Sequence, residues 1–206
     1  MRIAVVADEA SRSEWLSPGV QENAEIVWLD EPACPDNTFA CIDLLFPQFP
    51  ERAAEWAKFS PPLVIVNDVL KKNLLPPGFV RLNGWPSFLK RPLAEVAGPA
   101  GLMEKTGIVL AAFNRKAEWV ADVPGFIAAR VVSMIINEAY HSLEEGVSGK
   151  AAIDTAMKLG TNYPLGPFEW AEKIGVPAIC ELLSALGSEN SRYTPAPLLI
   201  KEALAV

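Results

Sequence analysis

Short apolar runs that stop at a polar residue fill the first 122 residues of this 206-residue chain. Such runs are typical of strands in a mostly parallel sheet covered on both faces, because the side chains of both faces are then buried. Helical character appears between them, in the segments 50–59 and 102–112. Strands that alternate with helices predict an α/β layer fold. The clearest expected strands lie at 3–8, 25–30, 40–46 and 62–68, with weaker candidates at 79–85, 92–98 and 117–122.

The pattern changes at residues 123–126, Val-Pro-Gly-Phe, where proline and glycine end the last expected strand. A long helix is predicted from there to about Glu145, with Gly146 placed to end it. This helix is apolar around most of its circumference, so it needs to be covered on several sides. A domain of about 80 residues supplies too little cover for that. The helix therefore predicts a subunit partner.

Shorter helices are expected after the long one. Ser148 is suited to cap the next helix, and two more are expected to begin near Pro167 and Pro177. We therefore expect two domains, an α/β domain at 1–122 and an all-α domain at 123–206.

Composition excludes several classes of function. The formal net charge is −7 and no run is rich in lysine or arginine, which argues against sequence-independent binding of nucleic acid. No apolar stretch approaches the roughly 20 residues that span a bilayer, and the N-terminus lacks the features of a signal peptide. Cys34, Cys41 and Cys180 lack the short pair spacing of a zinc site, which favours free thiols in a reducing cytosol. We expect a cytoplasmic protein.

A series of motifs follows in a fixed order after residue 123. They are PGFIAAR (124–130), NEA (137–139), EEG (144–146), AIDTAMKLG (152–160), YPLGPFE (163–169) and YTPAPLL (193–199). Their order and spacing resemble the helical C-terminal domain of the 3-hydroxyacyl-CoA dehydrogenase family. In that family the helical domain carries the dimer contact, so the resemblance implies a homodimer and a link to fatty-acid and acyl-CoA metabolism.

The N-terminal resemblance is fainter and implies a degenerate Rossmann-like domain. The family's first strand opens into a glycine-rich turn that binds NAD, but the segment 7–13, ADEASRS, contains no glycine. Glycines let the backbone approach the pyrophosphate closely at a helix N-terminus. Asp8 and Glu9 place carboxylates there instead, and a proline and a glycine shorten or break the helix that follows. Asp30 lies where the family's ribose-binding acid would fall, yet we expect weak or absent NAD binding.

The segment 79–96 resembles the family segment that carries its catalytic histidine. The histidine, which takes the hydroxyl proton, falls on Asn83, and the glutamate that orients it falls on Glu95. Asparagine does not titrate and cannot act as the base. His141, the only histidine, lies on the long helix and is interpreted as a surface or interface residue. Without a histidine, Glu95 is expected to lie too far from the substrate hydroxyl group to act as the base.

Two further family positions are altered. The segment 66–69, VNDV, is similar to a substrate-binding stretch of the family. This chain keeps the asparagine of that stretch as Asn67 but has Val69 where the family has a serine. The asparagine of the family's PGFI motif has become Ala129. These losses together predict a chain that kept the scaffold and lost the chemistry.

Three functions fit this sequence. The first is an acyl-CoA-binding relative that does not turn its ligand over, the second is an active NAD-dependent 3-hydroxyacyl-CoA dehydrogenase with altered residues, and the third is a non-enzymatic interaction subunit. The prolines and the glycine of the YPLGPFE motif fit two interpretations equally well. They either turn the chain or line a ligand-binding cleft. The candidate substrate-binding residues are Asn67, Asn83, Glu95, Tyr163 and Phe168, and no metal is expected.

Overall fold

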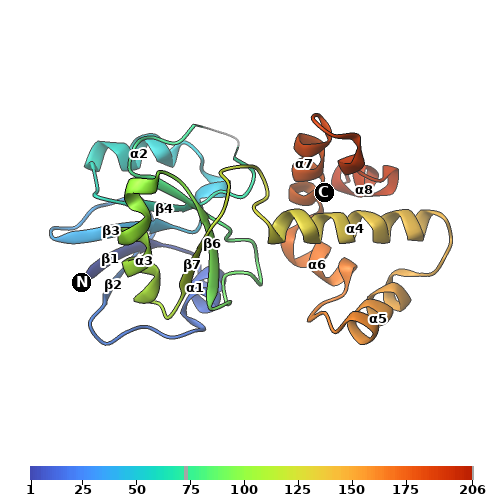
Figure 1. Cartoon of the computed structure of the whole chain (residues 1–206), viewed down its shortest axis with the longest axis horizontal. Helices are drawn as coiled ribbons and strands as arrows, with labels where there is room; N and C mark the ends of the chain where they lie inside the picture. The colour runs from blue at the N-terminus through green and yellow to red at the C-terminus, as the bar shows by residue number, and fades with distance from the viewer. Residues whose placement is uncertain (72–73, 206) are drawn as a thin grey trace. The chain divides into compact units, whose positions relative to one another are not determined.

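The computed structural model describes residues 1–71 and 74–205, and it divides the chain into two units, Met1–Phe126 and Ile127–Val206 (Figure 1). The first unit is an α/β layer structure and the second is all-helical. The fold class expected from the sequence is confirmed.

One mostly parallel sheet forms the centre of the first unit. Within the described residues it has seven strands in the order β2-β1-β3-β4-β5-β6-β7. Neighbouring strands run parallel except β5 and β6, which are antiparallel. The strands are β1 (Arg2–Val6), β2 (Glu25–Leu29), β3 (Thr38–Asp43), β4 (Val64–Asn67), β5 (Phe79–Leu82), β6 (Leu93–Ala97) and β7 (Lys116–Trp119).

Both faces of the sheet are covered, as the apolar runs predict. One face packs against Trp15 of helix α1 (Glu9–Leu16) and Leu110 of helix α3 (Met103–Ala111). The other packs against Trp56 of helix α2 (Arg52–Phe59). Two short 3₁₀ helices complete the unit, η1 (Phe46–Gln48) and η2 (Ala100–Leu102).

The prediction of a strand over 40–46 is partly wrong. β3 ends at Asp43, because the Asp43 carboxylate accepts a hydrogen bond from the Leu45 backbone N–H at 3.0 Å and turns the chain into η1. The connection from β2 to β3, residues 30–37, contains no helix, and Cys34 from it packs against the core that contains Trp56.

Six helical segments make up the second unit. They are α4 (Ala128–Glu144), α5 (Lys150–Thr161), α6 (Pro167–Ile174), α7 (Val176–Gly187), η3 (Ser191–Tyr193) and α8 (Pro197–Ala203), counted over the residues described there. Gly146 follows α4 with a φ of 72°, as expected for a residue that ends a helix. The predicted cap at Ser148 is wrong: α5 begins one residue later, so Gly149 takes the N-cap position without a side-chain hydrogen bond.

Two polar residues of α4, Ser133 and Asn137, lie on its buried side. Ser133 is 0% exposed and Asn137 is 3% exposed, whereas Ile127 and Val131 are 56% and 51% exposed. Asn137 is buried because both ends of its amide are used: Nδ2 donates to the Thr194 carbonyl at 3.0 Å, and Oδ1 accepts from the Ala196 N–H at 2.8 Å. None of the helices described is long and apolar enough to cross a membrane.

Candidate functional site

Asn67 closes β4 and holds the backbone around it. Its Nδ2 donates to the carbonyl of Leu44 at 3.2 Å and to that of Gly84 at 3.1 Å, while its Oδ1 accepts from the Gly84 N–H at 3.0 Å. Both amide hydrogens are therefore used within the protein. A Cβ added to Gly84 would lie 2.6 Å from Asn67 Oδ1, so a glycine is required there. Asn67, 7% exposed, holds the turn after β5.

Asn83 and Glu95 face each other across the antiparallel pair β5–β6. Asn83 Nδ2 donates to Glu95 Oε2 at 2.9 Å, and the Asn83 backbone N–H donates to the Glu95 carbonyl at 3.0 Å. The two side chains expected to work together are thus brought into contact. Asn83 is 5% exposed and Glu95 is half-buried. This pair supplies an amide and a carboxylate, and the amide cannot take up a proton.

The β1–α1 turn is closed by its own carboxylate. Asp8 is the N-cap of α1, and its Oδ1 accepts from the Ser11 N–H at 2.7 Å. Glu9 adds a second negative charge in the first turn. A helix N-terminus attracts anions through its free N–H groups, but here an acidic side chain already occupies that position. The residues present do not fit a dinucleotide pyrophosphate.

Asp30, the expected ribose ligand, follows β2 directly and is exposed. Its backbone carbonyl accepts a hydrogen bond from Arg52 Nη2 at 3.3 Å. Its position at the carboxyl end of the second strand agrees with the sequence-based expectation, while its role stays a prediction.

The loop after β5 is tied to α1 by residues that the sequence did not single out. Both carboxylate oxygens of Glu14 accept from the Ser87 N–H, at 2.8 and 3.1 Å. Arg115 is 4% exposed, donates to the Leu89 carbonyl, and stacks 4.0 Å from the ring centroid of Trp15. Burial lowers the pKa of Arg115 to about 10, so it remains a cation at neutral pH. These contacts fix the loop that begins at Asn83.

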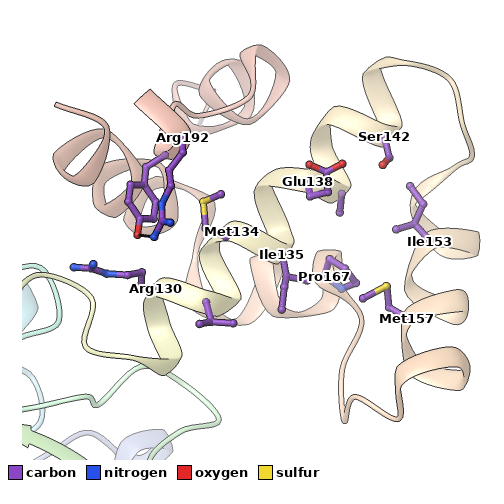
Figure 2. Close-up of a pocket in the computed structure, with 12 residues that line it drawn as sticks. Arg130, Met134, Ile135, Glu138, Ser142, Ile153, Met157, Pro167 and Arg192 are labelled. Atoms are coloured by element: carbon purple, nitrogen blue, oxygen red, sulfur yellow. Dashed lines mark hydrogen bonds between the residues drawn. The ribbon is translucent and has the colours of Figure 1, made fainter. Parts of the chain in front are cut away.

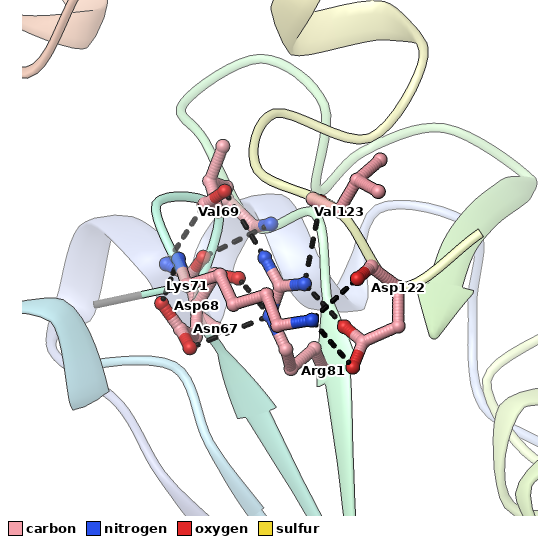
Figure 3. Close-up of polar contacts among 8 residues, drawn as sticks. Asn67, Asp68, Val69, Lys71, Arg81, Asp122 and Val123 are labelled. Carbon is pink, nitrogen blue, oxygen red and sulfur yellow. Dashed lines mark hydrogen bonds and ion pairs between the residues drawn. The ribbon is translucent and has the colours of Figure 1, made fainter. Parts of the chain in front are cut away.

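A buried arginine organises the carboxyl ends of β4 and β5 (Figure 3). Arg81, 3% exposed, donates from Nη1 to Asp122 Oδ1 at 2.6 Å and from Nη2 to the Val69 carbonyl at 3.1 Å. Its Nε lies 3.4 Å from Asp68 Oδ2, and its guanidinium lies 4.8 Å from the ring centroid of Phe126. The chain segment that leaves the first unit is thereby held against β5.

The pKa values of the two carboxylates around Arg81 are shifted in opposite directions. Burial raises the pKa of Asp68, although Arg81 opposes that effect. Burial also acts to raise the pKa of Asp122, but the hydrogen bonds from Arg81 and Lys71 outweigh it, so its pKa is lowered. Asp122 therefore stays ionised as the partner of Arg81.

The expected site residues of the second unit have packing roles. Phe168 is 8% exposed and its ring centroid lies 5.1 Å from that of Tyr140. Tyr163 packs on Trp170, with centroids 5.5 Å apart. Ala129 is fully buried. The candidate residues thus fall into two sets, one in each unit, and Phe168 and Tyr163 pack within the second unit.

The YPLGPFE motif turns the chain between α5 and α6. The Phe168 N–H donates to Asp154 Oδ1 at 2.8 Å, and the Gly166 N–H donates to Glu169 Oε2 at 2.9 Å. A Cβ on Gly166 would overlap the Asp154 side chain. These contacts give the motif a structural role.

A groove of about 440 Å³ runs along α4 in the second unit (Figure 2). Its lining is mostly apolar, and the charged lining residues in the described part are Arg130, Glu138 and Arg192. Figure 2 shows both arginines toward one end of α4 and Glu138 further along the same helix. The full lining comprises Arg130, Val131, Met134, Ile135, Glu138, Ala139, Ser142, Ile153, Met157, Pro167, Arg192 and Tyr193.

No group of three or more potential metal ligands exists among the described residues. Cys34, Cys41 and Cys180 are free thiols, and burial raises the pKa of Cys41. His141 is half-exposed on α4, with Nδ1 3.9 Å from Glu144 Oε2.

One of the missed residues carried a signal in the sequence. Arg81 stands inside an apolar strand run, and a charge buried in a strand is almost always paired. Glu14 and Arg115 gave no such signal, because their partners lie far along the chain: Ser87 is 73 residues from Glu14, and Glu14 is 101 residues from Arg115.

Comparison with protein families gives a match in the second unit. The model of the 3-hydroxyacyl-CoA dehydrogenase C-terminal domain matches residues 125–205. The 3-hydroxyadipyl-CoA dehydrogenase of Escherichia coli is 46% identical over 87 residues, which cover 41% of this chain and 18% of that protein. A probable 3-hydroxybutyryl-CoA dehydrogenase of Bacillus subtilis is 39% identical over 115 residues, which cover 53% of this chain and 40% of that protein. The chain thus spans well under half the length of these curated relatives.

Solved structures extend the similarity to the whole chain at the level of the fold. FadB2 of M. tuberculosis aligns over 99% of this chain and 93% of its own, with a TM-score of 0.76 and 16% identity. A 3-hydroxybutyryl-CoA dehydrogenase of Escherichia coli K12 aligns over 62% of this chain and 27% of its own, with a TM-score of 0.55 and 34% identity. At 16% identity the first of these similarities concerns the fold alone.

Proposed function

We propose that this chain, whose C-terminal unit matches the 3-hydroxyacyl-CoA dehydrogenase family over residues 125–205, binds an acyl-CoA thioester without oxidising or reducing it. One observation carries the proposal. Asn83, which falls on the position of the family's catalytic histidine, donates its amide to Glu95 at 2.9 Å. The Glu95 carboxylate, which would orient an imidazole in the family, here accepts a hydrogen bond from an amide, and an amide cannot take up a proton.

Oxidation of a 3-hydroxyacyl thioester requires a base at the hydroxyl group and a bound nicotinamide that accepts the hydride. The amide of Asn83 is neutral at all ordinary pH values. The Asp8 carboxylate caps α1 at 2.7 Å from the Ser11 nitrogen, where a pyrophosphate would need free N–H groups. Loss of the base alone would slow the reaction, and so would loss of the pyrophosphate site alone. The first affects proton removal and the second affects binding of the nicotinamide cofactor.

Retention of a thioester ligand is supported by two features. The curated relatives of the C-terminal unit are named for acyl-CoA substrates. The Asn83–Glu95 pair also places a half-buried carboxylate and an amide at the carboxyl end of β5, and both are types of group that hydrogen-bond polar ligands.

A turnover assay tests the missing chemistry. Purified protein is incubated with 3-hydroxybutyryl-CoA and NAD, and NADH formation is followed by absorbance beside the Escherichia coli 3-hydroxybutyryl-CoA dehydrogenase as a positive control. We expect no NADH above the protein-free blank, because both the base and the anion-binding turn are altered.

The variant Asn83→His separates the two causes. Restoring the imidazole beside Glu95 leaves Asp8 in place, so this variant is also expected to be inactive. NADH formation by the variant alone would show that NAD binds and that only the base is missing. NADH formation by the unaltered protein would overturn the proposal.

An interaction subunit is the second candidate function. It is favoured by two exposed apolar residues at the start of α4, the N-cap Ile127 and Val131, which are 56% and 51% exposed. Stable association with a partner and no response to a thioester would support this candidate over the first.

A further inference from the structure

Two of the three cysteines of this chain meet where the loop between β2 and β3 crosses the core of the first unit. Cys41 lies on β3, is 0% exposed, and pairs in the sheet with Ala4 of β1 and Val64 of β4. Cys34 lies in the loop, residues 30–37, and packs against the hydrophobic cluster that contains Cys41. A side-chain hydrogen bond joins the two thiols. Their sulfur atoms are therefore neighbours, although seven residues separate the two cysteines in the sequence.

The loop holds Cys34 in this position through bonds made directly after it. The Thr38 N–H and Oγ1 both donate to the Pro35 carbonyl, at 3.2 and 2.6 Å. Arg2 Nη1 donates to the Asp36 carbonyl at 2.7 Å, which ties the same turn to the first strand. The turn that follows Cys34 is thus anchored at both the second and the third strand of the chain's own sheet neighbours, β1 and β3. The cysteine is held over the core by the fold of the loop.

We propose that Cys34 and Cys41 form a reversible disulfide when the protein meets a peroxide. The sulfur atoms of a disulfide lie about 2.05 Å apart, and cysteines whose side chains point apart cannot be bridged unless the backbone moves. Thiols that share a hydrogen bond within one core point toward each other. The inference goes beyond the proposed function and does not depend on it, because neither cysteine is among the residues assigned to a ligand.

A metal ion explains this pair less well than a disulfide does. Zinc in structural sites almost always takes four ligands, and no group of three or more potential metal ligands exists in the described part of the chain. A cysteine also binds metal as the thiolate, whereas burial raises the pKa of Cys41 and keeps it a thiol at neutral pH. The pair is therefore suited to a two-electron redox change.

The exposure of the two thiols sets the order of the steps. Cys34 is only partly buried, so its sulfur attacks one oxygen of hydrogen peroxide first. The O–O bond breaks, water leaves, and Cys34 becomes a sulfenic acid. The Cys41 sulfur then attacks the Cys34 sulfur, the S–O bond breaks, and the hydroxyl group leaves with the Cys41 proton as a second water. Two electrons pass from the sulfurs to the peroxide, and a thiol reductant returns them by thiol–disulfide exchange.

Peptide mapping of the full chain tests the bond without any substitution. The reduced protein is treated with hydrogen peroxide, free thiols are alkylated with iodoacetamide in denaturant, and the chain is digested with trypsin. The tryptic peptide 13–52 contains Cys34 and Cys41, and the peptide 174–192 contains Cys180 alone. We expect peptide 13–52 to be unalkylated and lighter by two hydrogens, with Cys180 alkylated. Dithiothreitol added before the iodoacetamide should restore two alkylated cysteines to peptide 13–52.

Matched serine variants separate the pair from the third thiol. Cys180→Ser is the control and should still form the bond, so its two thiols should both disappear on treatment with peroxide and return with dithiothreitol. Cys34→Ser removes the first thiol to react, and Cys41 should then stay reduced and alkylatable, because it is fully buried. Disulfides between chains, a bond to Cys180, or oxidation of Cys34 to a sulfinic acid without loss of the Cys41 thiol would overturn the proposal.

Discussion

Asn67 holds the turn after β5 through both ends of its amide. Its three hydrogen bonds, to Leu44 and twice to Gly84, leave no amide hydrogen for a ligand. Asn67 therefore has a structural role at the carboxyl end of β4. The close approach of Asn67 also explains why residue 84 is a glycine, since a Cβ there would lie 2.6 Å from Asn67 Oδ1.

Replacement of this glycine tests the role of Asn67. Gly84→Ala forces the Asn67 amide out of place, so the free energy of unfolding should fall by about 1–3 kcal/mol, as for an overpacked core. Urea denaturation measures the change. Gly101→Ala is the matched control, because no atom lies within 4 Å of a Cβ added there. It should change stability by less than about 0.5 kcal/mol, and an equal loss in both variants would contradict the assignment.

At the residue scale, the sequence predicts where a side chain lies in the fold better than it predicts that side chain's hydrogen-bond partner. Asn67 and Asn83 stand at or directly after the ends of neighbouring strands, so their closeness follows from the sheet. The partner of Asn83 also followed from the resemblance to the family, because Glu95 aligns without a gap. The bond between Glu14 and Ser87 could not be predicted, since it depends on how a loop folds back onto α1.

The difference between expected and observed elements is greatest at α1. The strands are evident from their apolar runs, because a buried strand exposes neither face. α1 has only Trp15 buried among its eight residues, so it lacks the apolar period that marks a helix. Local hydrogen bonding defines it instead, above all the cap from Asp8.

Removal of that cap tests its contribution to the element. Asp8→Ala leaves the Ser11 N–H without its acceptor and should destabilise α1 by about 1 kcal/mol. Hydrogen exchange of the α1 amides measures the effect and should accelerate within residues 9–16. Asp8→Asn keeps an acceptor oxygen and is the matched control, so its exchange should stay near that of the unaltered protein. Equal acceleration in both variants would show that charge, and not capping, stabilises the helix.

The α4 helix shows how tertiary packing decides which face is buried. Ser133 and Asn137 are polar, yet both are buried. Asn137 is buried because its amide bonds the backbone at Thr194 and Ala196. The apolar residues Ile127 and Val131 are left outward instead. The order of polar and apolar residues along α4 therefore does not identify its exposed face. In the sequence, an asparagine whose amide is buried and hydrogen-bonded cannot be told from one that faces solvent.

The whole molecule combines a family C-terminal unit with an α/β unit whose polar residues bond one another. The side chains of Asp8, Asn67 and Asn83, near the carboxyl ends of β1, β4 and β5, each form hydrogen bonds within the protein. We propose that this molecule retains a thioester ligand and does not bind the nicotinamide cofactor. Binding of either ligand can be measured separately from turnover.

A thermal-shift titration of the purified full chain tests this claim most directly. Acetoacetyl-CoA, free coenzyme A and NADH are added separately over a range of concentrations, and the unfolding midpoint Tm is recorded. A ligand that binds only the folded state stabilises it by about 2.7 kcal/mol at 100 times its Kd, which corresponds to a rise of several degrees at about 2–4 °C per kcal/mol for a chain of this size. We predict such a rise with acetoacetyl-CoA and none with NADH. A concentration-dependent rise with NADH, or no rise with acetoacetyl-CoA, would contradict the account.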